Sequence, residues 1–187
     1  VKQPLGAVGI NVEDIDRIEN DDGSISKYDY GFLSRVLQDF IVKKKYKEAV
    51  GLCGLLLESF PNDTQIHYLR GLLNQKIGNF EQAIKDYNFL IEQEAADAQI
   101  LNNLGAIYAD KKESEEAQDL FIKAIGRNPD IAEVHNNLAD LSLKTKQYSR
   151  AIEEYNKVIE KEPNNIEALY NLGMAYMFSK DYSKARE

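Results

Sequence analysis

An alanine that returns every 34 residues is the feature that most limits how this chain can fold. The column is unbroken and consists of Ala49, Ala83, Ala117, Ala151 and Ala185. Twelve residues before each alanine lies a second column in which small residues dominate: Leu37, Gly71, Gly105, Ala139 and Gly173. A fixed period of this length indicates a stack of similar units, each of which packs on its neighbours.

Each unit contains two stretches with helical spacing of apolar residues. In the third unit Leu101, Leu104 and Tyr108 share one helix face, and Ala117 and Phe121 begin a second one. Polar joints of the length that connects antiparallel helices separate the two stretches. We therefore predict two helices per unit, with the small residues where the helices cross.

This frame resembles the tetratricopeptide repeat over residues 30–187. The third unit matches it most fully, at Leu101, Leu104, Gly105, Tyr108, Ala117, Phe121, Ala124 and Pro129. The resemblance implies an all-α fold, a right-handed superhelical solenoid of antiparallel helix pairs. It places repeats 1 to 4 at 30–63, 64–97, 98–131 and 132–165, and an incomplete repeat 5 at 166–187.

Residues 1–29 lie outside the repeats, and we predict an acidic, largely irregular extension. Within it Asn11 has the character of a helix cap, with Val12, Ile15 and Ile18 along one side of a short helix. Two roles stay open for this segment. It either shields the first repeat or acts as an acidic peptide that occupies a binding groove.

The resemblance also implies a concave surface lined by the first helix of each repeat. There Asn103, Asn137 and Asn171 occupy the same position of three successive repeats, and a column of amides can clamp the backbone of an extended peptide. The alternative is that these amides meet only solvent. The full set of candidate peptide-binding residues is Asn102, Asn103, Asn136, Asn137, Asp140, Lys144, Tyr170 and Asn171.

The charges expected on this surface favour a basic ligand in the later repeats, where Asp110, Glu133, Asp140 and Glu167 face a single cation, Lys144. Capture of acidic chaperone tails is not expected, because the family's basic clamp is absent at the matching positions. The net charge of −8 argues against nucleic acid as a partner. No stretch has the length and apolarity of a transmembrane segment.

Catalytic and metal-binding patterns are missing from the sequence. A single cysteine and two histidines exclude a disulfide framework and a Cys/His zinc site, and no cofactor motif is present. We interpret His67 and His135 as packed residues at helix interfaces and Cys53 as a core thiol. The chain is therefore not expected to be an enzyme by itself.

The function predicted from these observations is that of a protein-binding scaffold or adaptor, which holds an extended or helical segment of a partner. Two alternatives stay open. The array is the docking or regulatory arm of an enzyme whose catalytic domain lies outside the sequence, or it self-associates through the open fifth repeat. Because the chain begins without methionine, we expect a longer natural protein, and the compartment is open with the cytoplasm favoured.

Overall fold

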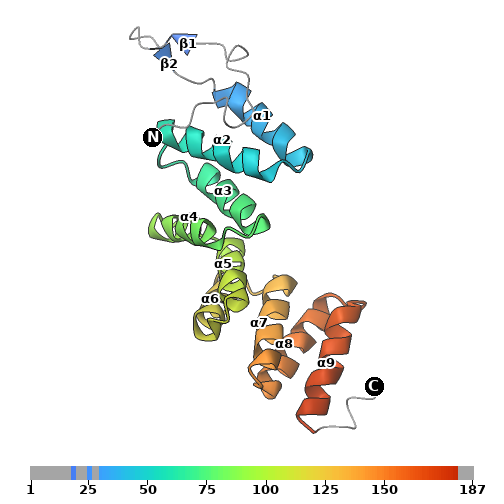
Figure 1. Cartoon of the computed structure of the whole chain (residues 1–187). Coiled ribbons are helices and arrows are strands. Elements are labelled where there is room, and N and C mark those ends of the chain that lie inside the picture. The colour runs from blue at the N-terminus through green and yellow to red at the C-terminus, as the bar shows by residue number, and fades with distance from the viewer. Residues whose placement is uncertain (1–17, 20–24, 27–29, 181–187) are drawn as a thin grey trace. The chain divides into compact units, whose positions relative to one another are not determined.

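The computed structural model describes residues 18–19, 25–26 and 30–180, and this part of the chain is helical almost throughout (Figure 1). The chain divides into two compact units, Val1–Ala95 and Ala96–Glu187, which we call the amino-terminal and carboxy-terminal halves. None of the helices described is both long enough and apolar enough to cross a bilayer. The predicted all-α fold is confirmed, with one minimal strand pair as its exception.

That strand pair lies in the amino-terminal half, where β1 (Ile18–Glu19) pairs antiparallel with β2 (Ile25–Ser26). Ile18 therefore does not belong to the short helix predicted from Asn11 onward, and that part of the prediction is wrong. The β-branched side chains of Ile18 and Ile25 favour an extended backbone, which the sequence reading of this segment did not weigh. The other residues of that predicted helix lie outside the described residues.

Four helices follow in the amino-terminal half: α1 (Tyr30–Val42), α2 (Tyr46–Ser59), α3 (Thr64–Lys76) and α4 (Phe80–Glu92). Each helix packs on the next one along the chain. Buried residues of α1, α2 and α3 form a common core, which consists of Leu33, Leu37, Phe40, Ala49, Leu52, Cys53, Leu55, Leu56, Leu57, Ile66 and Leu73. Cys53 is fully buried in it, and burial raises the pKa of its thiol to about 12.

The carboxy-terminal half contains five described helices: α5 (Ala98–Asp110), α6 (Ser114–Arg127), α7 (Ala132–Lys144), α8 (Tyr148–Lys161) and α9 (Ile166–Phe178). The pairs α5 with α6 and α7 with α8 form helical hairpins, and α9 packs on α8. The first helices of successive repeats also touch, because α7 contacts both α5 and α9. This contact places side chains of α5, α7 and α9 on one continuous face.

The two small-residue columns mark close contacts within the hairpins. Ala83, Ala117 and Ala151 are fully buried. A Cβ atom added to Gly105 would lie 2.7 Å from Cε1 of Phe121, a distance that real Cβ atoms almost never show. Gly105 is therefore required by the approach of the aromatic ring rather than by backbone conformation.

The turns inside the repeats adopt the same geometry at the same interval. The residues with left-handed backbone at these turns are Lys44 (φ 57°), Gly78 (φ 77°), Lys112 (φ 65°), Lys146 (φ 63°) and Lys180 (φ 68°). At the turn that contains Lys112, the amide of Glu113 donates to the carbonyl of Tyr108. This is the six-to-one hydrogen bond of a Schellman turn. Only Gly78 adopts this conformation without steric cost.

Side chains cap the first helices α3, α5 and α9, whereas Ile131 before α7 provides no side-chain cap. Asp63 accepts from the amides of Gln65 and Ile66, and Asp97 accepts from the amide of Ile100. A carboxylate at this position satisfies backbone donors that the helix leaves unpaired. These caps fix where α3 and α5 begin.

Two buried histidines, one in repeat 2 and one in repeat 4, each form a hydrogen bond to the end of the preceding repeat. In the amino-terminal half, Nε2 of His67 lies 3.0 Å from the carbonyl oxygen of Pro61, and its Nδ1 lies 2.9 Å from Asp86. Arg70 also binds this buried carboxylate, with Nη2 2.6 Å from Oδ1. His67, Arg70 and Asp86 thus form an internally paired polar network in repeat 2.

The same arrangement recurs in the carboxy-terminal half. Nε2 of His135 lies 2.9 Å from the carbonyl oxygen of Pro129, and its Nδ1 lies 2.6 Å from Glu154 on α8. His135 and Glu154 are both buried. Both ring nitrogens of each histidine are therefore occupied by structural contacts, which leaves neither ring placed to act as a catalytic base.

Candidate functional site

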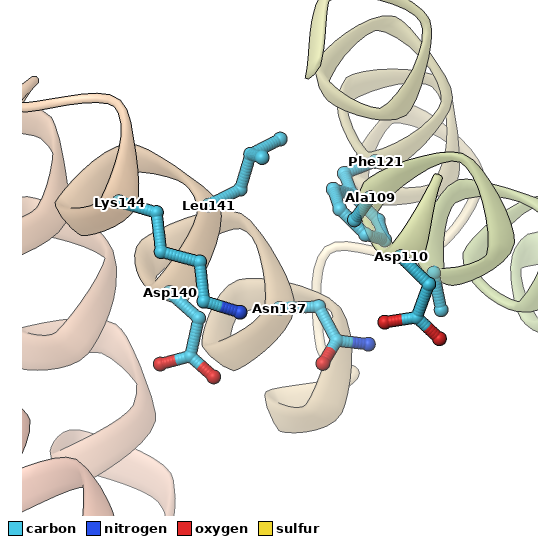
Figure 2. Close-up of a pocket in the computed structure, with 8 residues that line it drawn as sticks. Ala109, Asp110, Phe121, Asn137, Asp140, Leu141 and Lys144 are labelled. Atoms are coloured by element: carbon cyan, nitrogen blue, oxygen red, sulfur yellow. The ribbon is translucent and has the colours of Figure 1, made fainter. Parts of the chain in front are cut away.

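A pocket of about 100 Å³ opens between α5 and α7 in the carboxy-terminal half (Figure 2). Figure 2 shows side chains of the two helices facing one another across this hollow. We call it the α5–α7 pocket, and it is lined by Ala106, Ala109, Asp110, Phe121, Asn137, Asp140, Leu141 and Lys144. Three of these residues, Asn137, Asp140 and Lys144, are among those predicted from the sequence.

The inner part of the α5–α7 pocket is apolar. Phe121 of α6 is buried and contributes its ring, and Leu141 of α7 is buried beside it. Ala106 and Ala109 of α5 complete the lining with methyl groups only. A ligand atom that enters this part therefore meets hydrocarbon rather than hydrogen-bonding groups.

The outer part of the pocket carries two carboxylates and one ammonium group. Asp110 is exposed and forms no hydrogen bond or ion pair with any described residue. Lys144 forms no ion pair with Asp110 or Asp140, within the part of the chain that the structure describes. The pocket thus presents an excess of negative charge.

Asp140 is held in place by two donors that share its Oδ1 atom. The hydroxyl of Tyr155 donates to it from α8, and Nδ2 of Asn171 on α9 donates to it over 3.2 Å. Burial, followed by this bond to the Asp140 carboxylate, holds the pKa of Tyr155 far above its ordinary value. The second carboxylate oxygen of Asp140 is left for contacts outside the fold.

The predicted asparagine column does not stand free on the surface, because its amides bridge successive repeats. Nδ2 of Asn137 donates to Oδ1 of Asn102 over 2.9 Å, and Nδ2 of Asn102 donates to Glu133 over 3.1 Å. Asn103 is buried and accepts from Gln99 over 3.3 Å, while its own Nδ2 has no hydrogen-bond partner in the structure. Much of the donor capacity of this column therefore stabilises the stack.

The remaining predicted residues lie outside the α5–α7 pocket. Asn102 is fully buried, and Asn136 is partly buried with an Oδ1 atom that lacks a partner. Asn171 reaches the pocket only indirectly, through Asp140. Tyr170 is 68% exposed on α9, and it does not line the pocket.

Sequence reasoning missed the apolar part of the pocket, formed by Phe121, Ala106, Ala109 and Leu141. Phe121 was predicted only to pack at the helix contact, and neither alanine was among the candidate binding residues. A comparison of repeats could have indicated this part of the pocket, because Tyr87 and Tyr155 carry a hydroxyl group at the position where Phe121 has none.

A second hollow of about 580 Å³ lies over α6 and the turn between α7 and α8. Several of its polar groups already have partners, since Gln147 donates to Gln118 over 3.2 Å and Asp119 pairs with Lys123 over 2.6 Å. Its greater volume does not make it the better candidate, because it lacks the buried apolar floor of the α5–α7 pocket. Within the described residues, no group of three or more His, Cys, Asp or Glu is arranged to hold a metal ion.

Models of the tetratricopeptide repeat match the chain over residues 68–121 and 140–177. Among curated proteins, a TPR repeat-containing protein of Pseudomonas aeruginosa is 37% identical over 75 residues. That match covers 40% of this chain and 13% of the length of the relative. The family matches thus fall on the segments in which the 34-residue spacing was found.

Solved structures of similar fold agree with the family models. The crystal structure of the MamA protein covers 83% of this chain and 85% of its own at 22% identity, with a TM-score of 0.77. YrrB, described as a TPR protein with an unusual peptide-binding site, covers 82% and 79% at 15% identity, with a TM-score of 0.71. The Pseudomonas aeruginosa protein pilF covers 83% and 71% at 20% identity, also with a TM-score of 0.71. The spacing, the close helix contacts, the family models and the fold agree, and the chain belongs to the tetratricopeptide-repeat family.

Proposed function

We propose that this chain is a protein-binding scaffold and that the face formed by α5, α7 and α9 holds an extended segment of a partner protein. One observation carries the proposal: a pocket with an apolar floor and a charged rim opens between two adjacent first helices. Concave sites that combine apolar lining with a few polar groups are where proteins bind ligands. A groove beside such a pocket provides backbone contacts, and the pocket provides selectivity.

Asn137 is suited to meet the backbone of the bound segment. Its Nδ2 is engaged by Asn102, which fixes the orientation of the amide. Its Oδ1 then remains as an acceptor for a backbone N–H group of the ligand. A preset acceptor costs less conformational entropy on binding than a side chain that rotates freely.

The charge of the site supports a basic partner. Asp110 and Asp140 outnumber Lys144 on the rim, and the whole chain carries a net charge of −8. Opposite charges steer encounters and reject partners of the wrong sign. The described peptide-binding site of YrrB lends further support, since that protein has the same fold.

Binding of a library of blocked nonapeptides to the full chain tests this proposal, with fluorescence anisotropy as the measurement. We expect peptides to bind, and Asn137→Ala to weaken the best of them by about three- to tenfold, the value of one hydrogen bond. Asn156→Ala is the matched control, because Asn156 is exposed on α8 and is not among the residues that line the pocket. Equal binding by the wild type and Asn137→Ala, with both folded by circular dichroism, would show that the amide plays no part.

Self-association is a second candidate function, and the surface of α9 favours it. Several of its large apolar side chains are exposed: Ile166, Leu169, Tyr170, Met177 and Phe178. Exposed apolar side chains in such number on one helix are typical of a surface that contacts another protein. Sedimentation velocity over a concentration series should show reversible dimers that Leu169→Asp abolishes. A constant monomer mass at every concentration would remove this candidate.

A further inference from the structure

The residues that line the α5–α7 pocket include the positions at which repeats 2 and 4 contain a hydrogen-bonded pair and repeat 3 does not. Tyr87, Phe121 and Tyr155 occupy the same position of successive repeats. The hydroxyl of Tyr87 donates to Oε1 of Gln75 over 3.0 Å, and the hydroxyl of Tyr155 donates to Asp140. In both repeats the aromatic residue of the second helix therefore reaches a polar side chain on the first helix.

Repeat 3 lacks both halves of this pair. Phe121 carries no hydroxyl group, and the residues that correspond to Gln75 and Asp140 are Ala109 and Ala106. All three residues line the α5–α7 pocket. The donor and its possible acceptors are thus replaced together by smaller, apolar groups, and the space that they would fill opens to the surface.

The size and lining of the pocket suit the stem of one long, unbranched side chain. The volume of about 100 Å³ is several times the roughly 10–15 Å³ that one water molecule needs in the same measure, so the pocket has room for the methylene stem of a long side chain. Lysine and arginine bury their stems along apolar surfaces while their charged heads stay at the rim. Ala106, Ala109 and Phe121 provide the apolar surface that such a stem requires.

The rim supplies the partner for a cationic head. Asp110 forms no bond within the described chain, and Asp140 uses only Oδ1 for its contacts with Tyr155 and Asn171. Lys144 is the one cation among the lining residues, and it pairs with neither carboxylate. An acidic ligand group would instead face two carboxylates and is disfavoured.

We propose that the α5–α7 pocket is a specificity pocket that accepts one lysine or arginine side chain of the bound segment. This inference rests on the proposed function, since it names the side chain that an extended partner places there. In this proposal Phe121, Ala106 and Ala109 form the apolar space that accepts the stem of the side chain. Asp110 and Asp140 attract its charged head.

A guest series of blocked nonapeptides tests the inference, with an alanine and serine host and a central arginine, lysine, norleucine or glutamate. Chemical-shift titration of the full-length chain reports both affinity and the residues that respond. We expect arginine and lysine to bind about fivefold more tightly than norleucine, which has the stem without the charge. Glutamate should bind most weakly, and the pocket residues should shift with the guest.

Two variants separate shape from charge. Phe121→Tyr combined with Ala109→Gln rebuilds the neutral pair of repeat 2 inside the pocket, and we expect it to abolish the preference for basic guests. Asp110→Asn should reduce that preference while the fold is kept, and Asp119→Asn on α6 is the matched control that should not. Thermal melts show whether each variant folds. If the double variant does not fold, the effect of Asp110→Asn on the preference for basic guests decides the test.

The outcomes distinguish this inference from the function on which it rests. If all guests bind equally, or if the preference survives both variants, the pocket assignment is overturned while peptide binding stands. If no peptide produces shifts on α5, α7 or α9, both are overturned.

Discussion

Gly105 offers a direct test of how tightly the hairpins of this stack are packed. Replacing it with alanine places a methyl group 2.7 Å from Cε1 and 2.9 Å from Cδ1 of Phe121. Both atoms belong to a buried ring, so the ring or the helix must move. Overpacking of this kind costs about 1–3 kcal/mol of unfolding free energy.

A helix-propensity gain partly offsets that cost. Gly105 lies in the interior of α5, where alanine is favoured over glycine by about 0.5–1 kcal/mol. We therefore expect Gly105→Ala to destabilise the chain by about 1 kcal/mol. In repeat 4 the corresponding residue is Ala139, which is fully buried, so the same position of another repeat does contain a methyl group.

Gly54→Ala is the matched control. Gly54 lies in the interior of α2, and a Cβ atom there would meet nothing within 4 Å. The control should therefore stabilise the chain by about 0.5–1 kcal/mol, so the two substitutions are expected to have opposite signs. Urea unfolding followed by circular dichroism measures both. A stabilising effect of Gly105→Ala equal to that of the control would refute the close ring contact.

Three further predictions concern stability and reactivity. Lys112 has a left-handed backbone at φ 65°, which glycine adopts without steric cost. Lys112→Gly should therefore raise the unfolding free energy by about 0.5–1 kcal/mol in urea titrations. A lower unfolding free energy would contradict the proposed backbone strain. Asp86→Asn should cost about 2–4 kcal/mol, because Arg70 and His67 lose a buried carboxylate, and a melting temperature unchanged from the wild type would rule this out. Burial raises the pKa of Cys53 to about 12 from 9.0, so the stability that its neutral thiol contributes is present below pH 9 and lost as pH rises towards 12. A thiol reagent at pH 8 should label Cys53 only after unfolding; rapid labelling of the folded chain would contradict this burial.

The repeat architecture was predictable from the sequence because it depends on residues that every repeat must share. Ala83, Ala117 and Ala151 are fully buried at close helix contacts, where only small side chains fit. Because each repeat has the same contact, the alanines recur at a fixed interval that is visible in the sequence. The strand that contains Ile18 was not predictable in the same way. It lies outside the repeats, where no interval constrains the reading and two residues suffice to pair.

The candidate site was predictable only in part, for a different reason. The position of Asn137 on the first-helix face followed from the repeat, and the structure places it at the pocket. Its bond to Asn102 depends on how two helices of different repeats approach each other, which spacing alone does not specify. The apolar lining of the pocket comes from Phe121, Ala106 and Ala109, and each of these residues also satisfies the general pattern of its repeat, so the spacing did not mark them as a site.

The contacts of His67 with Pro61 and of His135 with Pro129 have a mechanical consequence. They join repeat 1 to repeat 2 and repeat 3 to repeat 4, while leucine occupies the histidine position in repeats 3 and 5, at Leu101 and Leu169. Replacing His135 by the leucine found in repeat 5 should therefore lower the force at which repeats 3 and 4 separate in an optical trap, and an unchanged force would contradict this role. Each histidine thus couples two neighbouring repeats mechanically, which the 34-residue spacing by itself does not indicate.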